Sequence, residues 1–266
     1  PVFLPMQAGI GLGPWPKSIK DRYGVDQFSQ FTGAEMMAQI HGFSREDLDE
    51  FALGSHRKAA VAADSGAFER EIVLVDGLDK EGNVRRHQRD EGIRGEASLE
   101  GLAELKSMAP DGRITAGNAS QLCDGASGVL VVSERALKQH GLTPIARIDN
   151  LTVTAGNPVI MLQEPIPATR RALERSGRKL DEIDLYEVNE AFAPVPLAWL
   201  KEIGADPAKL NVHGGAIALG HPLGASGTKL MATLIHALRA RDMRFGLQTM
   251  CEGGGIANVT IVEALS

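Results

Sequence analysis

The sequence predicts an α/β fold in which helices cover a sheet in layers, and three observations support this. From about residue 120 onward, short apolar runs typical of strands alternate with helical patterns. Glycine-rich turns fall where these strands meet helices, which is where α/β proteins place ligand sites. A helix expected over 227–239 is apolar nearly all round, which indicates burial on more than one face.

Composition narrows the class of protein. The chain has 266 residues, 43% of them hydrophobic and 23% charged, which is typical of a globular protein rather than a disordered one. A net charge of −6 argues against nucleic-acid binding through bulk charge. Two cysteines cannot form a disulfide framework, so we expect a cytoplasmic protein. No apolar run approaches the roughly 18 residues of a membrane span, so we expect no membrane partner.

The first 120 residues predict loops and helices. Glycine and proline punctuate the first 30 residues, which predicts a loop. Thr32 and Glu35 predict a capping box for a short helix, and Ser44 is expected to open a second one. We expect the second helix to stop at Gly66 and a strand to follow at 71–75. The stretch 77–95 is polar and irregular, and we interpret its basic cluster (Arg85, Arg86, His87, Arg89) as a solvated loop. A further helix is expected at 98–108.

After residue 120 the patterns become those of a layered α/β region. Strands are expected at 128–132, 145–155, 184–188, 245–250 and 258–262. Helices are expected at 133–140, 167–176, 190–203 and 227–239.

Three segments of this region carry residues suited to chemistry. They are Glu-Val-Asn-Glu-Ala-Phe-Ala at 187–193, a glycine- and histidine-rich run at 211–227, and Cys-Glu-Gly-Gly-Gly at 251–255. Asn189, His221 and the Gly253 N–H are the donor types of an oxyanion hole. Cys251 is a potential thiolate, and His221 is suited to polarise or deprotonate a thiol. Together these groups indicate acyl or enolate chemistry.

Structural and competing interpretations apply to the same residues. A lone cysteine is most often a buried apolar residue, which is our interpretation of Cys123. The Gly-Ala-Ser-Gly turn before the last helix suits either tight packing or a phosphate cradle. A phosphate-loop NTPase is disfavoured because Gly227-Thr228-Lys229 has the wrong order. No histidine or cysteine pair has the spacing of a zinc site, so we expect no metal.

Taken together, the motifs resemble the thiolase family. Asn-Glu-Ala-Phe-Ala, Gly-Gly-Ala-Ile-Ala-Leu-Gly-His-Pro-Leu-Gly-Ala-Ser-Gly and Cys-x-Gly-Gly-Gly occur in the family's order and separation. So does Thr-Ala-Gly-Asn-Ala-Ser at 115–120, followed by Asp-Gly-Ala. The resemblance covers essentially the whole chain and is strongest to the 3-ketoacyl-CoA thiolases (acetyl-CoA C-acyltransferases) of fatty-acid β-oxidation. It implies a thiolase-like layered α/β fold, with helix 227–239 in a middle layer.

The resemblance also implies roles for individual residues. His221 activates the acyl-accepting thiol and hydrogen-bonds the thioester oxygen, while Cys251 moves the proton at the acetyl α-carbon. Asn189 holds a water that completes this first oxyanion hole, and the Gly253 N–H serves a second. By the same resemblance, coenzyme A, a co-substrate rather than a permanently bound cofactor, is contacted by Ala119, Ser120 and Arg94, and the acyl pocket is bordered by Met161 and Phe192.

One part of the family pattern is not matched. The family's covalent nucleophile is another cysteine of the N-terminal domain, and neither Cys123 nor Cys251 falls in its segment. Because the chain also begins at Pro1 rather than Met, we expect a C-terminal fragment that mostly lacks the N-terminal thiolase domain. The expected parts are a partial loop domain (1–122), a return segment of the N-terminal domain (123–143) and a C-terminal domain (144–266), with one apolar face of helix 227–239 exposed.

The sequence therefore supports two functional hypotheses. The first is a thiolase that transfers acyl groups between 3-ketoacyl-CoA or acetyl-CoA and coenzyme A, acts as a homodimer or tetramer, and is inactive alone if the nucleophile is lacking. The second is a non-catalytic thiolase-like protein that binds acyl-CoA or serves as a split subunit. Ketoacyl synthases are disfavoured because their two-histidine site does not match Asn189 with Cys251. Ser29-Gln30 stands where some short-chain biosynthetic thiolases have His-Met, which puts that specificity in doubt.

Overall fold

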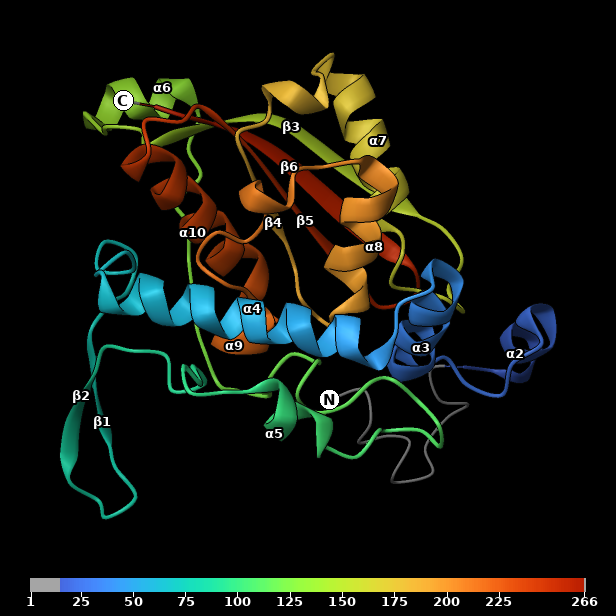
Figure 1. Ribbon diagram of the computed structural model, residues 1–266. Coiled ribbons are helices and arrows are strands. Elements are labelled where there is room, and N and C mark those ends of the chain that lie inside the picture. The colour runs from blue at the N-terminus through green and yellow to red at the C-terminus, as the bar shows by residue number, and fades with distance from the viewer. Residues whose placement is uncertain (1–14, 266) are drawn as a thin grey trace.

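A four-stranded mixed sheet forms the centre of the structure, a computed structural model that describes residues 15–265. The expected loop over residues 1–14 lies outside the described residues. The strand order is β3 (Ala146–Ala155), β6 (Ile256–Ala264), β5 (Phe245–Glu252) and β4 (Leu185–Val188). β6 runs antiparallel to both β3 and β5, whereas β4 is parallel to β5, so β4 and β5 end at the same edge of the sheet (Figure 1).

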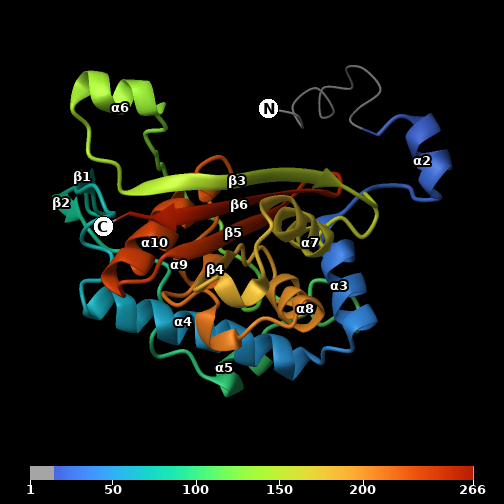
Figure 2. The ribbon, with the colours of Figure 1, turned by 90° about the horizontal axis from the view of Figure 1, so that it is seen from above.

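Helices cover both faces of this sheet, as the sequence predicts. α7 (Pro165–Ser176) and α8 (Pro194–Ile203) lie on one face, and α10 (Ser226–Ala240) lies on the other (Figure 2). Gly246 of β5 allows α10 to approach closely, because a Cβ there would lie 2.8 Å from a Leu238 methyl. Trp199 of α8 is fully buried in the aliphatic core on the opposite side. The predicted layered α/β arrangement is therefore confirmed.

The first half of the chain wraps around this layered unit. α3 (Gln30–His41) packs on α8, and the long α4 (Arg45–Asp64) packs on α5 (Leu99–Ala103) and on the short α9 (Ala216–Leu219). The remaining elements are α2 (Lys17–Tyr23), a hairpin of β1 (Val75–Leu78) and β2 (Val84–His87), α6 (Glu134–His140), and two 3-10 turns at Leu180–Glu182 and Pro207–Lys209. No described helix is both long enough and apolar enough to cross a membrane.

The predicted caps of the first two helices have different outcomes. Ser44 opens α4 as expected, and Asp47 completes a capping box there. The capping box of Thr32 and Glu35 is wrong, because α3 already begins at Gln30. The Glu35 carboxylate instead accepts hydrogen bonds from the backbone N–H groups of 113 and 114, at 2.6 and 2.7 Å. A distant loop thus uses the side chain that the local pattern assigned to the cap.

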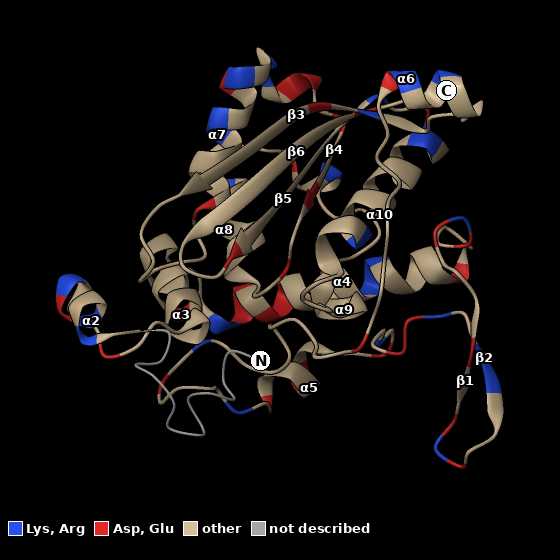
Figure 3. Cartoon of the chain, turned by 180° about the vertical axis from the view of Figure 1, so that it is seen from behind, with Lys and Arg blue, Asp and Glu red and all other residues tan. Residues whose placement is uncertain are grey.

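The irregular stretch predicted at 77–95 contains most of an exposed hairpin. The strand predicted at 71–75 is wrong except at its last residue, since β1 begins at Val75 and pairs antiparallel with β2 (Figure 1). Basic and acidic residues both occur on this hairpin, as the blue and red segments of Figure 3 show. The arginines of the basic cluster form ion pairs with acidic side chains. The pairs are Arg85–Asp79, Arg86–Asp76 and Arg89–Asp64. The side chains of β1 and β2 are all exposed, so the cluster is solvated as predicted. Arg85, Arg86 and His87 lie in β2, however, and not in a loop.

Several other predicted elements need correction. The apolar run at 128–132 forms no strand in the described structure, and Leu130 is 79% exposed. The helix predicted at 98–108 ends at Ala103, the helix predicted at 190–203 begins at Pro194, and the first 30 residues contain α2. The remaining predictions after residue 132 are confirmed within a few residues at each end.

The expected exposed apolar face of α10 is also wrong. Leu230, Leu234 and Leu238 are all buried, and the helix packs on β4, β5 and β6 of the sheet. Exposed apolar side chains lie instead on the edge strand β3, at Leu151 and Val153.

Candidate active site

Two of the predicted catalytic residues lie at the carboxyl ends of the parallel strands β4 and β5. Asn189 comes directly after β4, and its backbone N–H donates to the Thr249 carbonyl of β5 at 3.0 Å. Cys251 lies two residues further along β5. Because parallel strands end at the same edge of a sheet, the strand pairing brings Asn189 and Cys251 to one edge.

His221 reaches this edge from the connection between α9 and α10. The preceding Gly220 has a φ of +84° and passes so close to the Cys123 sulfur that a Cβ would collide with it. The backbone N–H of His221 donates to the Gln121 carbonyl at 3.1 Å. The Gln121 side chain in turn donates to Gly92 and Ile217 carbonyls at 2.8 and 2.7 Å. Contacts from three parts of the chain therefore hold the histidine.

The imidazole of His221 lies between Asn189 and Ser226. Its Nε2 is 3.3 Å from the Asn189 Nδ2, and its Nδ1 is 2.5 Å from the Ser226 Oγ. Burial, and secondly the positive charge of Lys229, lower the pKa of His221 below its ordinary value of 6.5. The ring is therefore neutral near pH 7. The Asn189 Oδ1 is buried and has no hydrogen-bond partner among residues 15–265.

Cys251 belongs to the apolar core on the other face of the sheet from α10. It shares that core cluster with Met161 and Phe192, the two residues expected to border an acyl pocket. Burial raises the pKa of the Cys251 thiol to about 12. The sulfur is therefore protonated at neutral pH and is suited to donate a proton rather than to attack as a thiolate.

Gly253 lies in the exposed turn that joins β5 to β6. The turn is held against the segment after β3, because the Gly156 N–H donates to the Gly255 carbonyl at 2.8 Å. Gly255 has a φ of +78°, and a Cβ there would lie 2.7 Å from the Asn157 carbonyl oxygen. Both the positive φ and the close approach to Asn157 require glycine at 255. Gly253 therefore lies two residues before a position whose backbone is held in place.

The structure brings together most of the residues expected to contact coenzyme A or the acyl group. Ala119 forms a backbone bridge with Phe192, and the Ser120 N–H donates to the Ala191 carbonyl at 3.0 Å. Arg94 lies apart from them with an exposed side chain, and its backbone N–H donates to His56 Nδ1 at 3.2 Å. The structure shows no ion pair for the Arg94 guanidinium among the residues it describes.

Sequence reasoning missed a buried carboxylate that braces the histidine loop. Glu190 accepts hydrogen bonds from Ser55 Oγ at 2.6 Å, Asn211 Nδ2 at 2.8 Å and the Ile217 N–H at 3.2 Å. Burial raises the pKa of Glu190, and these donors act in the opposite direction. The one sequence feature that points to Glu190 is its position directly after Asn189 in the same motif. The contact between Ser226 and His221 also escapes sequence reasoning, because the Gly-Ala-Ser-Gly turn suits packing or a phosphate cradle equally well.

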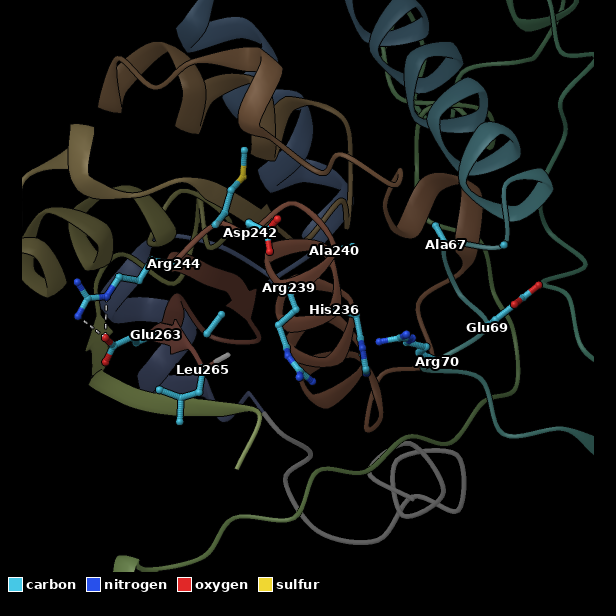
Figure 4. Close-up of a pocket in the computed structure, with 13 residues that line it drawn as sticks. Ala67, Glu69, Arg70, His236, Arg239, Ala240, Asp242, Arg244, Glu263 and Leu265 are labelled. Atoms are coloured by element: carbon cyan, nitrogen blue, oxygen red, sulfur yellow. Dashed lines mark hydrogen bonds and ion pairs between the residues drawn. The ribbon is translucent and has the colours of Figure 1, made fainter. Parts of the chain in front are cut away.

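One large cavity lies away from these residues. It has a volume of about 910 Å³ and opens between the far end of α10 and the segment after α4 (Figure 4). Arginine and acidic side chains both line it, among them Arg70, Arg239 and Glu263. A smaller cavity of about 440 Å³ lies beside the candidate site, between Cys123 and Pro222. Cys123 is exposed, so the expectation that it is a buried apolar residue is wrong. The residues from 15 to 265 include no cluster of histidine, cysteine and acidic side chains arranged for a metal.

Comparisons with known proteins identify the family of the chain. The family model for the thiolase C-terminal domain matches residues 142–264, and that for the thiolase N-terminal domain matches residues 19–135. The chain is 54% identical over 244 residues to steroid 3-ketoacyl-CoA thiolase FadA6 of Mycobacterium tuberculosis, covering 92% of this chain and 58% of that protein. It is 48% identical over 237 residues to a 3-ketoacyl-CoA thiolase of Yersinia pestis, covering 87% and 61% respectively.

Solved structures are similar over nearly the whole chain. A Bacillus anthracis acetyl-CoA acetyltransferase superposes with a TM-score of 0.86 at 37% identity, covering 94% of this chain and 64% of that one. Human mitochondrial 3-ketoacyl-CoA thiolase gives a TM-score of 0.83 at 38% identity, with the same two shares. The thiolase-like α/β fold is thus confirmed.

One expectation about the family is corrected. We expected the N-terminal thiolase domain to be mostly missing, but the model for that domain matches residues 19–135, so its absence is not supported. The chain spans about 58–64% of the length of the relatives it matches. The domain matches, the identities and the superpositions agree, and the chain belongs to the thiolase family.

Proposed function

We propose that this protein transfers acyl groups between 3-ketoacyl-CoA and coenzyme A, in the direction of thiolysis. The observation that carries the proposal is the hydrogen-bonded pair of Asn189 and His221 at the sheet edge where β5 carries the buried thiol of Cys251. A neutral imidazole, an amide and a protonated thiol at one edge provide a base, a donor and an acid. The 3-ketoacyl-CoA thiolases among its relatives support the same substrate class.

The proposed reaction divides the work among these residues. The nucleophile is a thiolate that the family resemblance places in another cysteine, distinct from Cys123 and Cys251. It attacks the 3-keto carbon, the C2–C3 bond breaks to leave an acyl-enzyme, and acetyl-CoA leaves as its enolate. Cys251 donates its thiol proton to C2 of this enolate. His221 then takes the proton of the coenzyme A thiol, which attacks the acyl-enzyme and releases the shortened acyl-CoA. A water held by Asn189, together with His221, binds one oxyanion, and the Gly253 N–H binds the second.

The binding residues follow from the same proposal. Ala119 and Ser120 line the channel for the pantetheine arm, Arg94 contacts the nucleotide end of coenzyme A, and Met161 and Phe192 border the acyl chain. Coenzyme A is a co-substrate here, with no permanently bound cofactor. We also propose a homodimer or tetramer, a cytoplasmic location, and domain limits at 1–122, 123–143 and 144–266.

A second function is favoured by one specific observation. The chain contains two cysteines, Cys123 and Cys251, and neither falls where the family resemblance places the covalent nucleophile. Two kinds of thiolase-like protein are consistent with this observation. One binds acyl-CoA without turnover, and the other supplies its acid–base residues to a catalytic partner subunit. The intact set of Asn189, His221 and Cys251 favours the catalytic proposal, because a protein freed from catalysis has no need of all three.

Calorimetry and a turnover assay on the same preparation separate these functions. Acetoacetyl-CoA is titrated into the purified protein, and its cleavage by coenzyme A is followed in parallel. Thiolysis that disappears in Cys251→Ala, with acyl-CoA binding retained, supports the catalytic proposal. Saturable binding without turnover supports the binding or split-subunit function, and near-wild-type turnover in Cys251→Ala would overturn the role of that thiol. His140→Ala, on the exposed helix α6, is the matched control.

A further inference from the structure

The hydroxyl of Ser226 connects His221 to the Pro222 carbonyl through hydrogen bonds. Ser226 is the first residue of α10, and its side chain is 2% exposed. Its Oγ lies 3.0 Å from the Pro222 carbonyl oxygen and 2.5 Å from His221 Nδ1. A carbonyl oxygen only accepts, so the single hydroxyl proton of Ser226 is directed to Pro222. The oxygen of Ser226 is then left to accept a proton from His221 Nδ1.

The other side of the ring gives the same assignment. His221 Nε2 faces the Nδ2 group of Asn189 at 3.3 Å, and an amide NH₂ only donates. Nε2 is therefore the acceptor of the neutral ring, and Nδ1 carries its proton. The hydrogen bonds run in one direction, from Asn189 through His221 and Ser226 to the Pro222 carbonyl.

We propose that Ser226 is a positioning residue that holds His221 in the tautomer protonated on Nδ1, so that Nε2 carries the lone pair that accepts a proton from the substrate thiol. The proposal deepens the function proposed above and rests on it for its catalytic meaning. A base that takes the proton of a thiol through Nε2 must have its lone pair there. Once Nε2 is protonated, it donates to a substrate oxygen while Nδ1 keeps Ser226 as its acceptor. One hydroxyl thus supports both tasks of the histidine.

The position of Ser226 makes this geometry dependable. Ser226 begins a buried 15-residue helix that packs on β4, β5 and β6, so its backbone cannot shift independently of the sheet. His221 lies five residues earlier, and its backbone is held by Gln121. Lys229 is the charged group that most affects the ring after burial, and it lowers the pKa of His221. Among residues 15–265 the hydrogen-bond partner of His221 Nδ1 is the Ser226 hydroxyl, so this hydroxyl is the feature that selects the Nδ1 proton.

Nitrogen NMR of the histidine side chains tests the tautomer without reference to activity. The protein is labelled with ¹⁵N-histidine, and His221→Asn identifies the His221 signals by their loss. The wild type should show protonated Nδ1 and bare Nε2 at pH 8, whereas protonated Nε2 would overturn the proposal. In Ser226→Ala the ratio of the two tautomers should shift about fivefold toward Nε2–H, as expected for the loss of one hydrogen bond. An unchanged ratio in a folded Ser226→Ala would also overturn it.

Two further variants keep the result decisive. Ser226→Thr retains the hydroxyl and should retain the Nδ1–H tautomer, and a folded threonine variant with the Nε2–H tautomer would contradict the proposal. If the alanine variant does not fold, the tautomer of the wild type at pH 8 remains the decisive measurement. Ser127→Ala removes a nearby exposed hydroxyl that bonds Ala225 and Thr228 but not His221, and it should leave the His221 signals unchanged. If the wild type shows the Nδ1–H tautomer and its dependence on Ser226 but cleaves no acetoacetyl-CoA, the positioning inference stands and the proposed function fails.

Discussion

The Asn189 amide lies 3.3 Å from His221 Nε2, although 32 residues separate the two in the chain. The end of β4 supplies Asn189, and the turn between α9 and α10 supplies His221. Strand pairing fixes the first, since its N–H is bonded to Thr249, and Gln121 fixes the second. The pair therefore depends on two separate backbone anchors rather than on one loop.

Replacing Asn189 tests the donor function of this pair. Asn189→Ala should reduce kcat for acetoacetyl-CoA thiolysis by roughly 100- to 1,000-fold, because one oxyanion-hole donor is lost. KM should change much less, since the donor acts mainly on the charge that develops in the transition state. Steady-state kinetics measure both. Asn83→Ala, in the exposed hairpin, is the matched control, and a similar loss in that variant would show that the effect is not specific.

Alkylation of the two cysteines should separate them by pH. Burial raises the pKa of Cys251 to about 12, so at pH 8 only about one thiol in ten thousand is ionised. Cys251 should resist iodoacetamide at pH 8 and react faster with each unit of pH up to about 12. Cys123 is exposed, and its smaller pKa increase should let it react first. Peptide mass spectrometry follows both sites, and rapid labelling of Cys251 at pH 8 would contradict the assignment of a protonated acid.

The stability of the fold should fall as the pH drops below 6.5. His56 is buried and accepts a hydrogen bond from the Arg94 N–H, and burial with the charge of Arg94 lowers its pKa to about 4. The unfolded chain therefore binds a proton at a higher pH than the folded one. The stabilisation is fully present above pH 6.5, is lost between pH 6.5 and 4, and amounts to on the order of 3 kcal/mol.

Urea unfolding between pH 7 and pH 4.5 measures this loss. His56→Gln should make the free energy of unfolding fall less steeply with decreasing pH than in the wild type, while His140→Gln on the exposed α6 should not. His213 is also buried with a pKa lowered to about 4, so part of the pH dependence should persist in His56→Gln. Equal slopes for His56→Gln and the wild type would contradict the role of His56.

Glu190 should contribute to stability and to the position of the histidine loop. Glu190→Gln places an NH₂ group where the carboxylate now accepts from Ser55, Asn211 and Ile217, so at least one buried donor loses its acceptor. We expect the free energy of unfolding to fall by about 2–3 kcal/mol, measured by urea denaturation at pH 7. Glu134→Gln, on the exposed helix α6, should change it by less than about 0.5 kcal/mol.

The candidate site was predictable where its chemistry lies in short motifs. His221, Asn189 and Cys251 were identified from glycine-rich or strand-end segments whose residue types suit acyl chemistry. Glu190 lies in the same motif, yet its three partners come from α4 and from the 211–217 segment, which no local pattern connects to it. Ser226 is five residues from His221, but its contact depends on how the turn at 221–226 folds before α10 begins.

The sequence by itself determined the layered α/β class, the elements after residue 132 and the residue types of the candidate site, because side-chain periodicity and glycine turns are local properties. Tertiary structure alone decided what each local pattern became. Glu35 was predicted to cap its own helix and instead binds the backbone at 113 and 114. The apolar run at 128–132 was predicted to be a strand, but it pairs with no strand in the described structure, and a strand exists only through its partner. The free energy of such contacts comes from groups distant in the chain, which no local pattern records.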